Sequence, residues 1–146
     1  GGFLYDSDSC NDELPYYVEV HGSPFLVVPY SKVYNDVRYL LSPTYSTPRH
    51  FFESLRSGVD YFCNEAAAGE GSKMMTVGLH ERWSGQAGRA SAVRDFVEYV
   101  QDRPDVIFMR RADIARWWRD HHSEWEPVGG EPVGGEPVGE DQGAQA

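Results

Sequence analysis

Cysteine is scarce in this sequence. Cys10 and Cys63 are its only two cysteines, and they belong to no CxxC motif or Cys/His cluster. Disulfide frameworks and zinc sites both need cysteines in recognisable groups. The pattern therefore favours two reduced thiols in a cytosolic protein over a disulfide or a zinc site. We predict a cytoplasmic location.

Long apolar runs and basic residues are also in short supply. No run approaches the roughly 20 apolar residues that a membrane-spanning helix needs. The sequence has 13 Lys and Arg residues and 23 Asp and Glu residues, so its formal net charge is −10. Half of this charge comes from the last 21 residues. Without a stripe of Lys or Arg, an acidic body repels a phosphate backbone. We expect neither a nucleic acid nor a membrane as partner.

The start of the chain lacks both a methionine and the basic-then-apolar pattern of a signal peptide. It opens directly on the strand-like residues Gly2 to Tyr5. We therefore expect further sequence upstream of Gly1, where any targeting peptide would lie.

The carboxyl-terminal end is a repeat, EPVGG EPVGG EPVGE followed by DQGAQA. Proline at every fifth position excludes a helix, and the repeat has too little apolar surface to fold. The sequence therefore predicts an ordered domain over residues 1–125 and a disordered, inert tail over 126–146.

Within the body, strand-like and helical patterns alternate. Strands are predicted for Gly2–Tyr5, for a hairpin of Tyr16–Val20 with Phe25–Val28, and for Met74–Leu79 and Val106–Met109. The first helix begins at Thr47-Pro48 and has Phe52, Leu55, Val59 and Phe62 on its apolar face. The second has Val93, Phe96, Val97 and Val100 and stops at Arg103-Pro104; the last has Ile114, Trp117, Trp118 and His121.

Short, continuously apolar strands such as VIFM indicate burial on both faces, as in a parallel sheet between helices. The strand–helix order predicts an α/β fold. A complete (β/α) barrel needs about 250 residues. The abrupt start favours half of such a barrel over a small open sheet. A half-barrel exposes strand edges, so we predict self-association of the isolated chain.

Three polar clusters follow predicted strands, and in parallel α/β folds the carboxyl ends of strands carry the functional groups. The clusters are Asp6, Asp8 and Asp12; His80, Glu81 and Arg82; and Arg110 and Arg111. The acidic stretch DSDSCNDE does not match an EF-hand loop, and a turn with Asx caps is an equally good interpretation. A histidine at the end of a strand can reach a pocket, and histidine is the side chain most used for proton transfer near neutral pH, but a structural role explains His80 equally well.

Four separated segments resemble one family. They are GGFLYDSDSCNDELPYY, FLVVPYSKVYNDVRYL, MMTVGLHERWSGQAGR and VIFMRRADIARWWRDHH. In this order and spacing they resemble the polysaccharide-deacetylase-like allantoinases of purine catabolism, a branch of the NodB-homology superfamily. The resemblance covers nearly all of residues 1–122 and corresponds to the carboxyl-terminal half of those enzymes.

The resemblance implies a distorted (β/α) barrel that hydrolyses C–N bonds other than peptide bonds. It implies that His80 is the general acid. It implies a substrate pocket with three parts. Asp6, Asp8 and Asp12 come from the acidic loop, Asn35 and Asp36 come from the N-D-x-R element of residues 35–38, and Arg82 lies beside the histidine. The expected substrate is a small cyclic amide, as for an allantoinase; the alternative is the N-acetylated sugar of a polysaccharide deacetylase.

The family's catalytic aspartate and metal-binding histidines lie upstream of the part that this chain resembles. No H-x-x-x-H motif or equivalent aspartate pair occurs here. We expect no metal or other cofactor in this chain; zinc is expected only with ligands from an amino-terminal half. That half is the expected partner, the isolated chain is expected to be inactive, and the complete protein is expected to be a homo-oligomer. The alternative of another class is a non-catalytic binding domain on the same scaffold.

Overall fold

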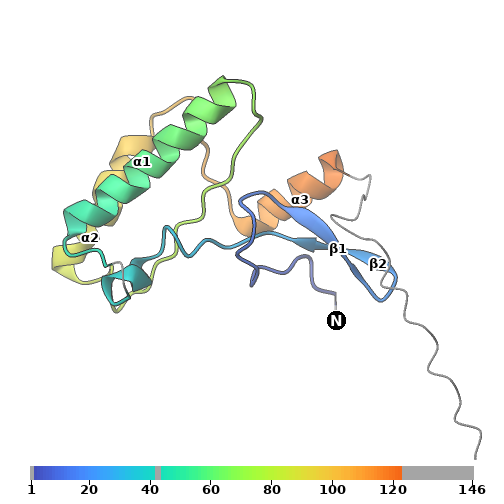
Figure 1. Cartoon of the computed structure of the whole chain (residues 1–146), viewed down its shortest axis with the longest axis horizontal. Helices are drawn as coiled ribbons and strands as arrows, with labels where there is room; N and C mark the ends of the chain where they lie inside the picture. Colours follow the sequence, from blue (N-terminus) through green and yellow to red (C-terminus); the bar gives the residue numbers. More distant parts are fainter. Residues whose placement is uncertain (1, 42–43, 123–146) are drawn as a thin grey trace, which may run out of the picture.

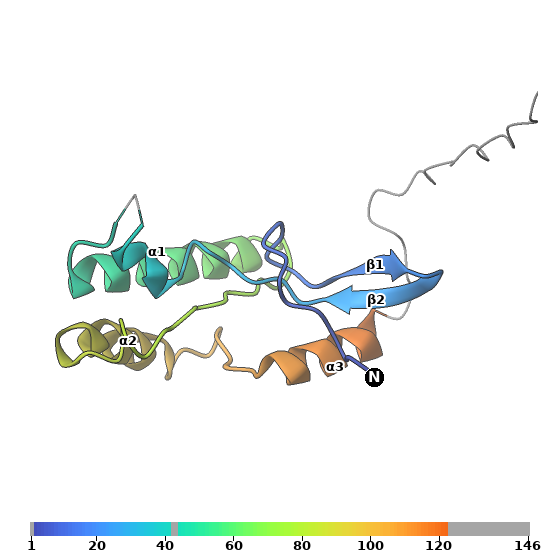
Figure 2. The same ribbon diagram turned by 90° about the horizontal axis from the view of Figure 1, so that it is seen from below.

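The structure, a computed structural model, describes residues 2–41 and 44–122. The predicted tail and the last residues of the predicted 1–125 domain lie outside this range. The helices and strands form two groups. Helices α1 and α2 lie side by side in one group, and a β-hairpin lies over α3 in the other (Figures 1 and 2). Extended segments run between the groups, and the candidate site lies on them.

The hairpin forms where the sequence predicts it. Strand β1 (Tyr16–Val20) pairs antiparallel with β2 (Ser23–Val27). The turn residues His21 and Gly22 both have positive φ, at 51° and 74°. Such a turn has the twist that a two-residue hairpin loop requires, and glycine adopts it without steric cost.

Helix α1 (Pro48–Ala67) begins at the predicted cap. The Thr47 side chain accepts a hydrogen bond from the His50 amide at 3.2 Å, and Pro48 occupies the first turn. Leu55 and Val59 are buried as predicted, but the phenylalanines of the predicted face are not. Phe51 is fully buried, whereas Phe52 and Phe62 are only partly buried.

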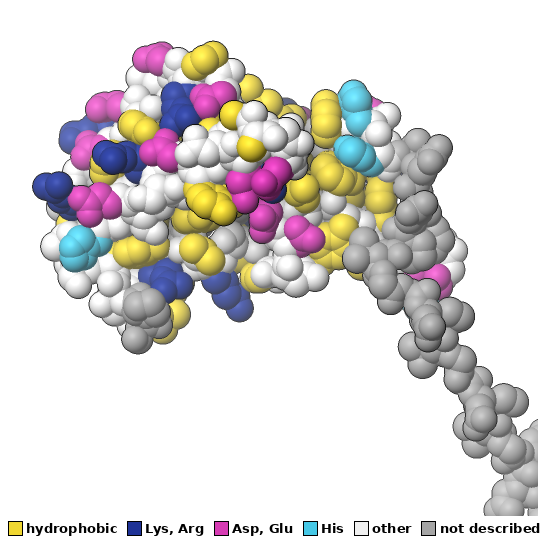
Figure 3. All heavy atoms as spheres, turned by 45° about the horizontal axis from the view of Figure 1, so that its top comes forward, with side chains coloured by type: hydrophobic (Ala, Val, Ile, Leu, Met, Phe, Trp, Pro, Cys, Tyr) yellow, Lys and Arg dark blue, Asp and Glu magenta, His cyan; other side chains and the backbone are white. Residues whose placement is uncertain are grey.

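Helix α2 (Ala87–Val100) packs on α1 and completes the larger core. This core consists of Phe51, Leu55, Val59, Ala92, Phe96 and Val100. Val97, predicted on the buried face, is exposed, because Ala92, Phe96 and Val100 form the contact stripe. The surface of this helical group is a mixture of acidic and basic side chains (Figure 3).

Helix α3 (Arg111–His121) belongs to a second, smaller core. Its Ala115 packs with Leu26 and Val28, at the end of the hairpin, and Trp118 adds a partly buried ring. Trp117 and His121, predicted on the apolar face, are exposed. A small residue at the centre of the contact lets the helix lie close to the hairpin.

Three predicted strands are wrong for the described chain. Gly2–Tyr5, Met74–Leu79 and Val106–Met109 form no ladder; single parallel bridges join Asp6 to Val27 and Asn35 to Gly78. The only sheet among residues 2–41 and 44–122 is the antiparallel hairpin, not the predicted parallel sheet. A strand needs hydrogen-bonding neighbours as well as apolar residues, and these segments have almost none.

The described residues form a small α/β domain, in agreement with the predicted class. None of its described helices is both long and apolar enough to cross a membrane.

Candidate active site

Asp36 is at the centre of the site. It is the first residue of a 3₁₀ turn, η1 (Asp36–Tyr39), and its side chain is completely buried. The preceding Asn35 is also buried and caps this turn, accepting a hydrogen bond from the Val37 amide at 2.8 Å. Asn35 therefore shapes the backbone that directs the Asp36 carboxylate inwards.

The Asp36 carboxylate holds His80 by two hydrogen bonds. Its Oδ1 lies 2.7 Å from Nδ1 of the imidazole, and its Oδ2 accepts the His80 amide at 2.8 Å. Oδ2 also accepts the Ser84 amide at 3.2 Å. One buried carboxylate thus fixes both the ring and the loop of residues 80–84 around it.

The imidazole faces solvent on its other side. The His80 side chain is 38% exposed, although its partner is fully buried. The Trp83 ring lies 4.5 Å from the imidazole, centroid to centroid, and covers part of it. Because Nδ1 is occupied by Asp36, Nε2 is the nitrogen left for a ligand.

Opposing effects act on the charge of Asp36. Burial raises the pKa of the carboxyl, but hydrogen bonds from His80 and Ser84 outweigh it and leave the pKa below its ordinary value. Asp36 is therefore ionised at neutral pH. A buried carboxylate stabilises the imidazolium form of the histidine beside it and fixes the ring's orientation.

The segment before His80 approaches its neighbours very closely. Gly78 exchanges backbone hydrogen bonds with Tyr34 and Asp36. A Cβ atom at Gly78 would lie 2.5 Å from Nδ2 of Asn35 and 2.8 Å from the Tyr30 hydroxyl. Glycine at this position therefore lets the two extended segments meet, which brings Asp36 and His80 together across 44 residues.

The acidic loop does not contact His80 through any hydrogen bond. Asp6 Oδ2 accepts the Asp8 amide, and Asp12 Oδ1 accepts the amides of Glu13 and Leu14. These are short-range Asx-type turns, one of the two interpretations that the sequence left open. The structure brings Asp36 to His80 but not Asp6, Asp8 or Asp12.

A pocket of about 260 Å³ lies next to Tyr30 and Tyr34, and Asp36 does not line it. Asp12 and Glu13 line it from the acidic loop, and Tyr30, Tyr34 and Thr76 line it from the two extended segments. His80 is not among its lining residues. The Tyr30 side chain connects the two places, since it lines the pocket and its hydroxyl also lies against Gly78.

The arginines of the predicted clusters have different surroundings. Arg82 is exposed, and its guanidinium lies 4.8 Å from the Trp83 ring centroid. Arg110 pairs with Asp113 on α3, while Arg111 donates to the carbonyls of Val28 and Pro29. Arg110 and Arg111 are therefore scaffold residues.

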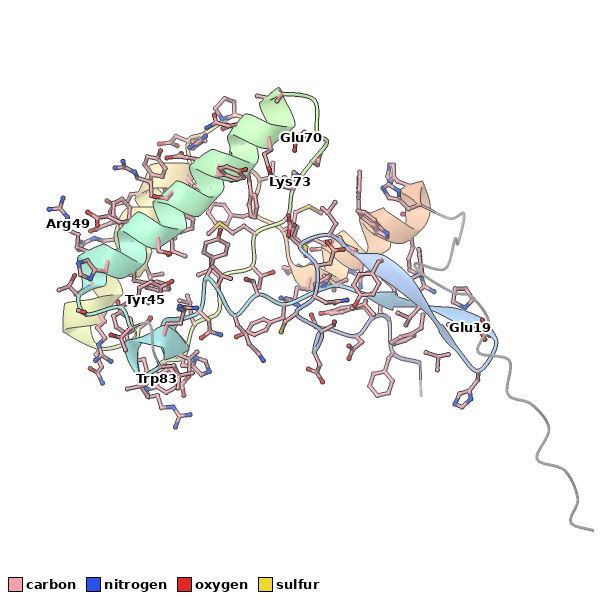
Figure 4. All side chains as sticks on the ribbon, viewed as in Figure 1. Glu19, Tyr45, Arg49, Glu70, Lys73 and Trp83 are labelled. Carbon is pink, nitrogen blue, oxygen red and sulfur yellow. The ribbon has the colours of Figure 1, made fainter. Side chains whose placement is uncertain are left out.

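Trp83, Ser84 and Tyr30 are site residues that the sequence did not single out. Trp83 and the η1 region lie at the same end of the molecule in Figure 4, away from Glu70 and Lys73. The HERW motif places Trp83 close to His80 in sequence, so its contact was foreseeable. Ser84 contributes its backbone amide, which donates to Asp36. Every residue except proline has such an amide, so the residue type at position 84 could not predict this contact.

No group of three His, Cys, Asp or Glu side chains among residues 2–41 and 44–122 could hold a metal ion.

Known proteins resemble this chain in sequence and in structure, although no protein-family model matches it. A Schizosaccharomyces pombe protein whose name places it among the polysaccharide deacetylases is 32% identical over 127 residues, which is 81% of this chain and 39% of that protein. The crystal structure of a probable polysaccharide deacetylase from Pseudomonas aeruginosa PAO1 is 39% identical with a TM-score of 0.77, covering 84% of this chain and 41% of that one.

An allantoinase is among the similar structures. The crystal structure of the allantoinase Puue is also 39% identical with a TM-score of 0.77, and the match covers 85% of this chain and 41% of the allantoinase. This chain thus spans about two fifths of the length of the relatives that it matches. Its relatives are polysaccharide-deacetylase-like proteins, including an allantoinase, and it shares their α/β fold over the aligned part.

Proposed function

We propose that this chain carries the general-acid part of a hydrolase that acts on C–N bonds other than peptide bonds. The Asp36–His80 dyad is the observation that carries the proposal: an ionised, buried carboxylate holds Nδ1, and the imidazole remains open to solvent. The expected substrate is a cyclic amide of the allantoin type. The relatives named above support this reaction class.

In this proposal His80 donates the proton that an amide nitrogen needs as it departs. Attack of water on the amide carbon gives a tetrahedral intermediate, and the C–N bond breaks as the nitrogen takes up a proton. Imidazolium is suited to this step because it loses its proton near neutral pH. Asp36 acts as a positioning residue, because it is fully buried and contacts the substrate only through His80.

The base that activates water and the donors that stabilise the oxyanion are still required. We infer that they come from an amino-terminal part of a distorted (β/α) barrel, of which this chain forms the carboxyl-terminal part. The share of the relatives that the chain covers supports this arrangement. Asp6, Asp8, Asp12, Asn35 and Arg82 remain predicted pocket residues.

A chimera tests the function. Residues 1–125 would replace the aligned part of the allantoinase Puue, and allantoin ring opening would be measured. We expect hydrolysis by the chimera, and a kcat lowered about 10²-fold or more by His80→Gln. Asp36→Asn should lower kcat with little change in KM, because Asp36 orients the acid rather than binding substrate.

His121→Gln is the matched control, because His121 is an exposed histidine on α3, remote from Asp36. It should leave kcat unchanged. A chimera that melts cooperatively yet opens no allantoin, or one in which His80→Gln has the rate of the parent, would contradict the proposal. The melting curve separates this outcome from simple misfolding.

A polysaccharide deacetylase is the second candidate, favoured by the names of the Schizosaccharomyces pombe and Pseudomonas aeruginosa relatives. The same dyad would protonate the amine that leaves an N-acetyl group. Release of acetate from N-acetylated sugar oligomers by the chimera, without ring opening of allantoin, would decide for this candidate.

A further inference from the structure

The hydroxyl of Ser84 is buried without a hydrogen-bond partner among the described residues. In residues 2–41 and 44–122, the Tyr39 hydroxyl is the only other buried side-chain oxygen of this kind. The Tyr39 ring packs against Tyr45 and Phe51 in the larger core, at centroid distances of 5.9 and 5.7 Å. Ser84 is 6% exposed and lies in the loop that Asp36 holds. Nearly all buried polar side chains in proteins have a partner, so Ser84 is an exception that calls for an explanation.

The backbone of Ser84 limits how far its hydroxyl lies from Asp36. The Ser84 amide nitrogen lies 3.2 Å from Oδ2 of that carboxylate. In a serine, Oγ is three covalent bonds from the amide nitrogen, and the torsion χ1 alone sets its direction. Because χ1 has three staggered minima, its rotation moves Oγ between positions that all stay close to the amide. The amide and the hydroxyl of Ser84 can therefore donate to the same carboxylate.

The Asp36 carboxylate has room for one more donor. An ionised carboxylate presents about four acceptor positions. Among the described residues Asp36 uses three, for the imidazole of His80 and for the amides of His80 and Ser84. Its side chain is completely buried, so bulk water does not reach the fourth. The hydroxyl of Ser84, as well as its amide, helps to hold the pKa of Asp36 below its ordinary value, which agrees with a hydroxyl near the carboxylate.

Proton donation by His80 changes the surroundings of this carboxylate. His80 is the charged partner of Asp36 among the described residues, provided that the imidazole is protonated. Once Nε2 has given its proton to the departing nitrogen, the ring is neutral and keeps only its Nδ1–H. The carboxylate is then buried without an adjacent cation, which is unfavourable. A further donor would stabilise its charge at this point and keep it from taking the Nδ1 proton.

We propose that Ser84 is a positioning residue for His80, whose buried hydroxyl donates the fourth hydrogen bond to the Asp36 carboxylate. Rotation about χ1 brings the hydroxyl to its acceptor. The bond keeps Asp36 ionised and leaves the ring proton on Nδ1, so that Nε2 takes a new proton from solvent before the next turnover. No atom of Ser84 enters the reaction. The role in hydrolysis rests on the proposed function, whereas the contact with Asp36 does not.

A double-mutant cycle in the intact 146-residue chain tests the contact without turnover. In urea unfolding at pH 7, Ser84→Ala should lower the folding equilibrium constant about tenfold or more, because it removes a hydrogen bond to a charged group. In an Asp36→Asn background the same change should cost about threefold or less, because a neutral amide is a weaker acceptor. An equal loss in both backgrounds, as from a serine that only fills space, would overturn the proposal.

Ser57→Ala is the matched control, because Ser57 is exposed on α1. It should change the folding equilibrium constant at most about twofold, and equally in the two backgrounds.

The chimera with the allantoinase Puue gives a second measurement, which also decides where D36N is too unstable for the cycle. Ser84→Ala should lower kcat about tenfold and leave KM unchanged, because Ser84 acts on the acid rather than on the substrate. Ser84→Thr keeps the hydroxyl and should retain most of the kcat of the parent. An active chimera in which Ser84→Ala has the parent's kcat, or in which a folded Ser84→Thr loses as much as Ser84→Ala, would remove Ser84 from the mechanism.

The two experiments separate this proposal from the proposed function. Coupling between Ser84 and Asp36 in the intact chain, with no hydrolysis by a folded chimera, would refute the function and retain the contact. Hydrolysis that depends on His80, with no coupling between Ser84 and Asp36, would retain the function and overturn this inference.

Discussion

Asp36 shows how much a single buried carboxylate can organise. It accepts hydrogen bonds from the amides of His80 and Ser84 and from the imidazole of His80. None of these partners is near it in sequence. The same residue therefore contributes to stability, by holding the loop, and to the proposed chemistry, by holding the ring.

Asp36→Asn should destabilise the chain in a pH-dependent manner. At pH 7 we expect a loss of about 1.5–3 kcal/mol in the free energy of unfolding, the range for hydrogen bonds to charged groups. The pKa of Asp36 is lowered in the folded state, so the stability that its charge provides is complete above about pH 4. That stability is lost as the pH falls further, through the folded-state pKa.

Urea unfolding of the parent and the D36N variant at pH 7, 5 and 3 measures this difference. Asp95→Asn is the control, because Asp95 is exposed and pairs only with the exposed Arg94; surface pairs contribute about 0–1 kcal/mol. A stability difference between parent and D36N that is as large at pH 3 as at pH 7 would show that the carboxylate charge is not responsible.

At the scale of elements, adjacent phenylalanines on α1 have different roles. Phe51 is completely buried against α2, whereas Phe52 is partly buried and packs edge-on to Tyr99. Helical spacing predicted Phe52 on the buried face. The two choices differ by only about 100° around a helix, and the position of α2 decides between them.

Phe51→Ala and Phe52→Ala therefore make a matched pair. We expect Phe51→Ala to cost about 3–5 kcal/mol, the range for a fully buried phenylalanine. Phe52→Ala should cost clearly less, because its ring already contacts solvent. Thermal unfolding by circular dichroism would rank the two, and a larger loss from Phe52→Ala would mean that α1 is rotated from the arrangement described above.

At the scale of the whole molecule, the extended segments have few partners. Ile107 is 77% exposed and Phe108 is 64% exposed, and neither backbone takes part in a ladder. Apolar side chains beside unpaired backbone groups favour association with another strand. This arrangement supports the expected self-association of the chain.

We expect the apparent mass in sedimentation velocity to rise with protein concentration. Ile107→Asp combined with Phe108→Asp should shift the distribution towards the monomer, because charge opposes strand addition. The control is Tyr61→Asp, at a large exposed side chain on α1. A parent chain that stays monomeric at all concentrations would contradict the expectation.

The sequence alone predicted those features that depend on residues close together in the chain. Thr47 and Pro48 define the start of α1, since cap and first-turn preferences depend on neighbouring residues only. The hairpin follows from residues around one turn. His80 stood out because it ends an apolar run, and the N-D-x-R element pointed to Asp36 through a family resemblance.

Only the tertiary structure decided which of these residues meet. It joined Asp36 to His80 across 44 residues, whereas the side chains of Asp6 and Asp12 accept hydrogen bonds only from nearby amides. It also left Val106–Met109 without the ladder that an apolar pattern suggests. Composition and periodicity record what each residue prefers locally. Hydrogen bonds between distant segments depend on where the chain brings them, which no local pattern contains.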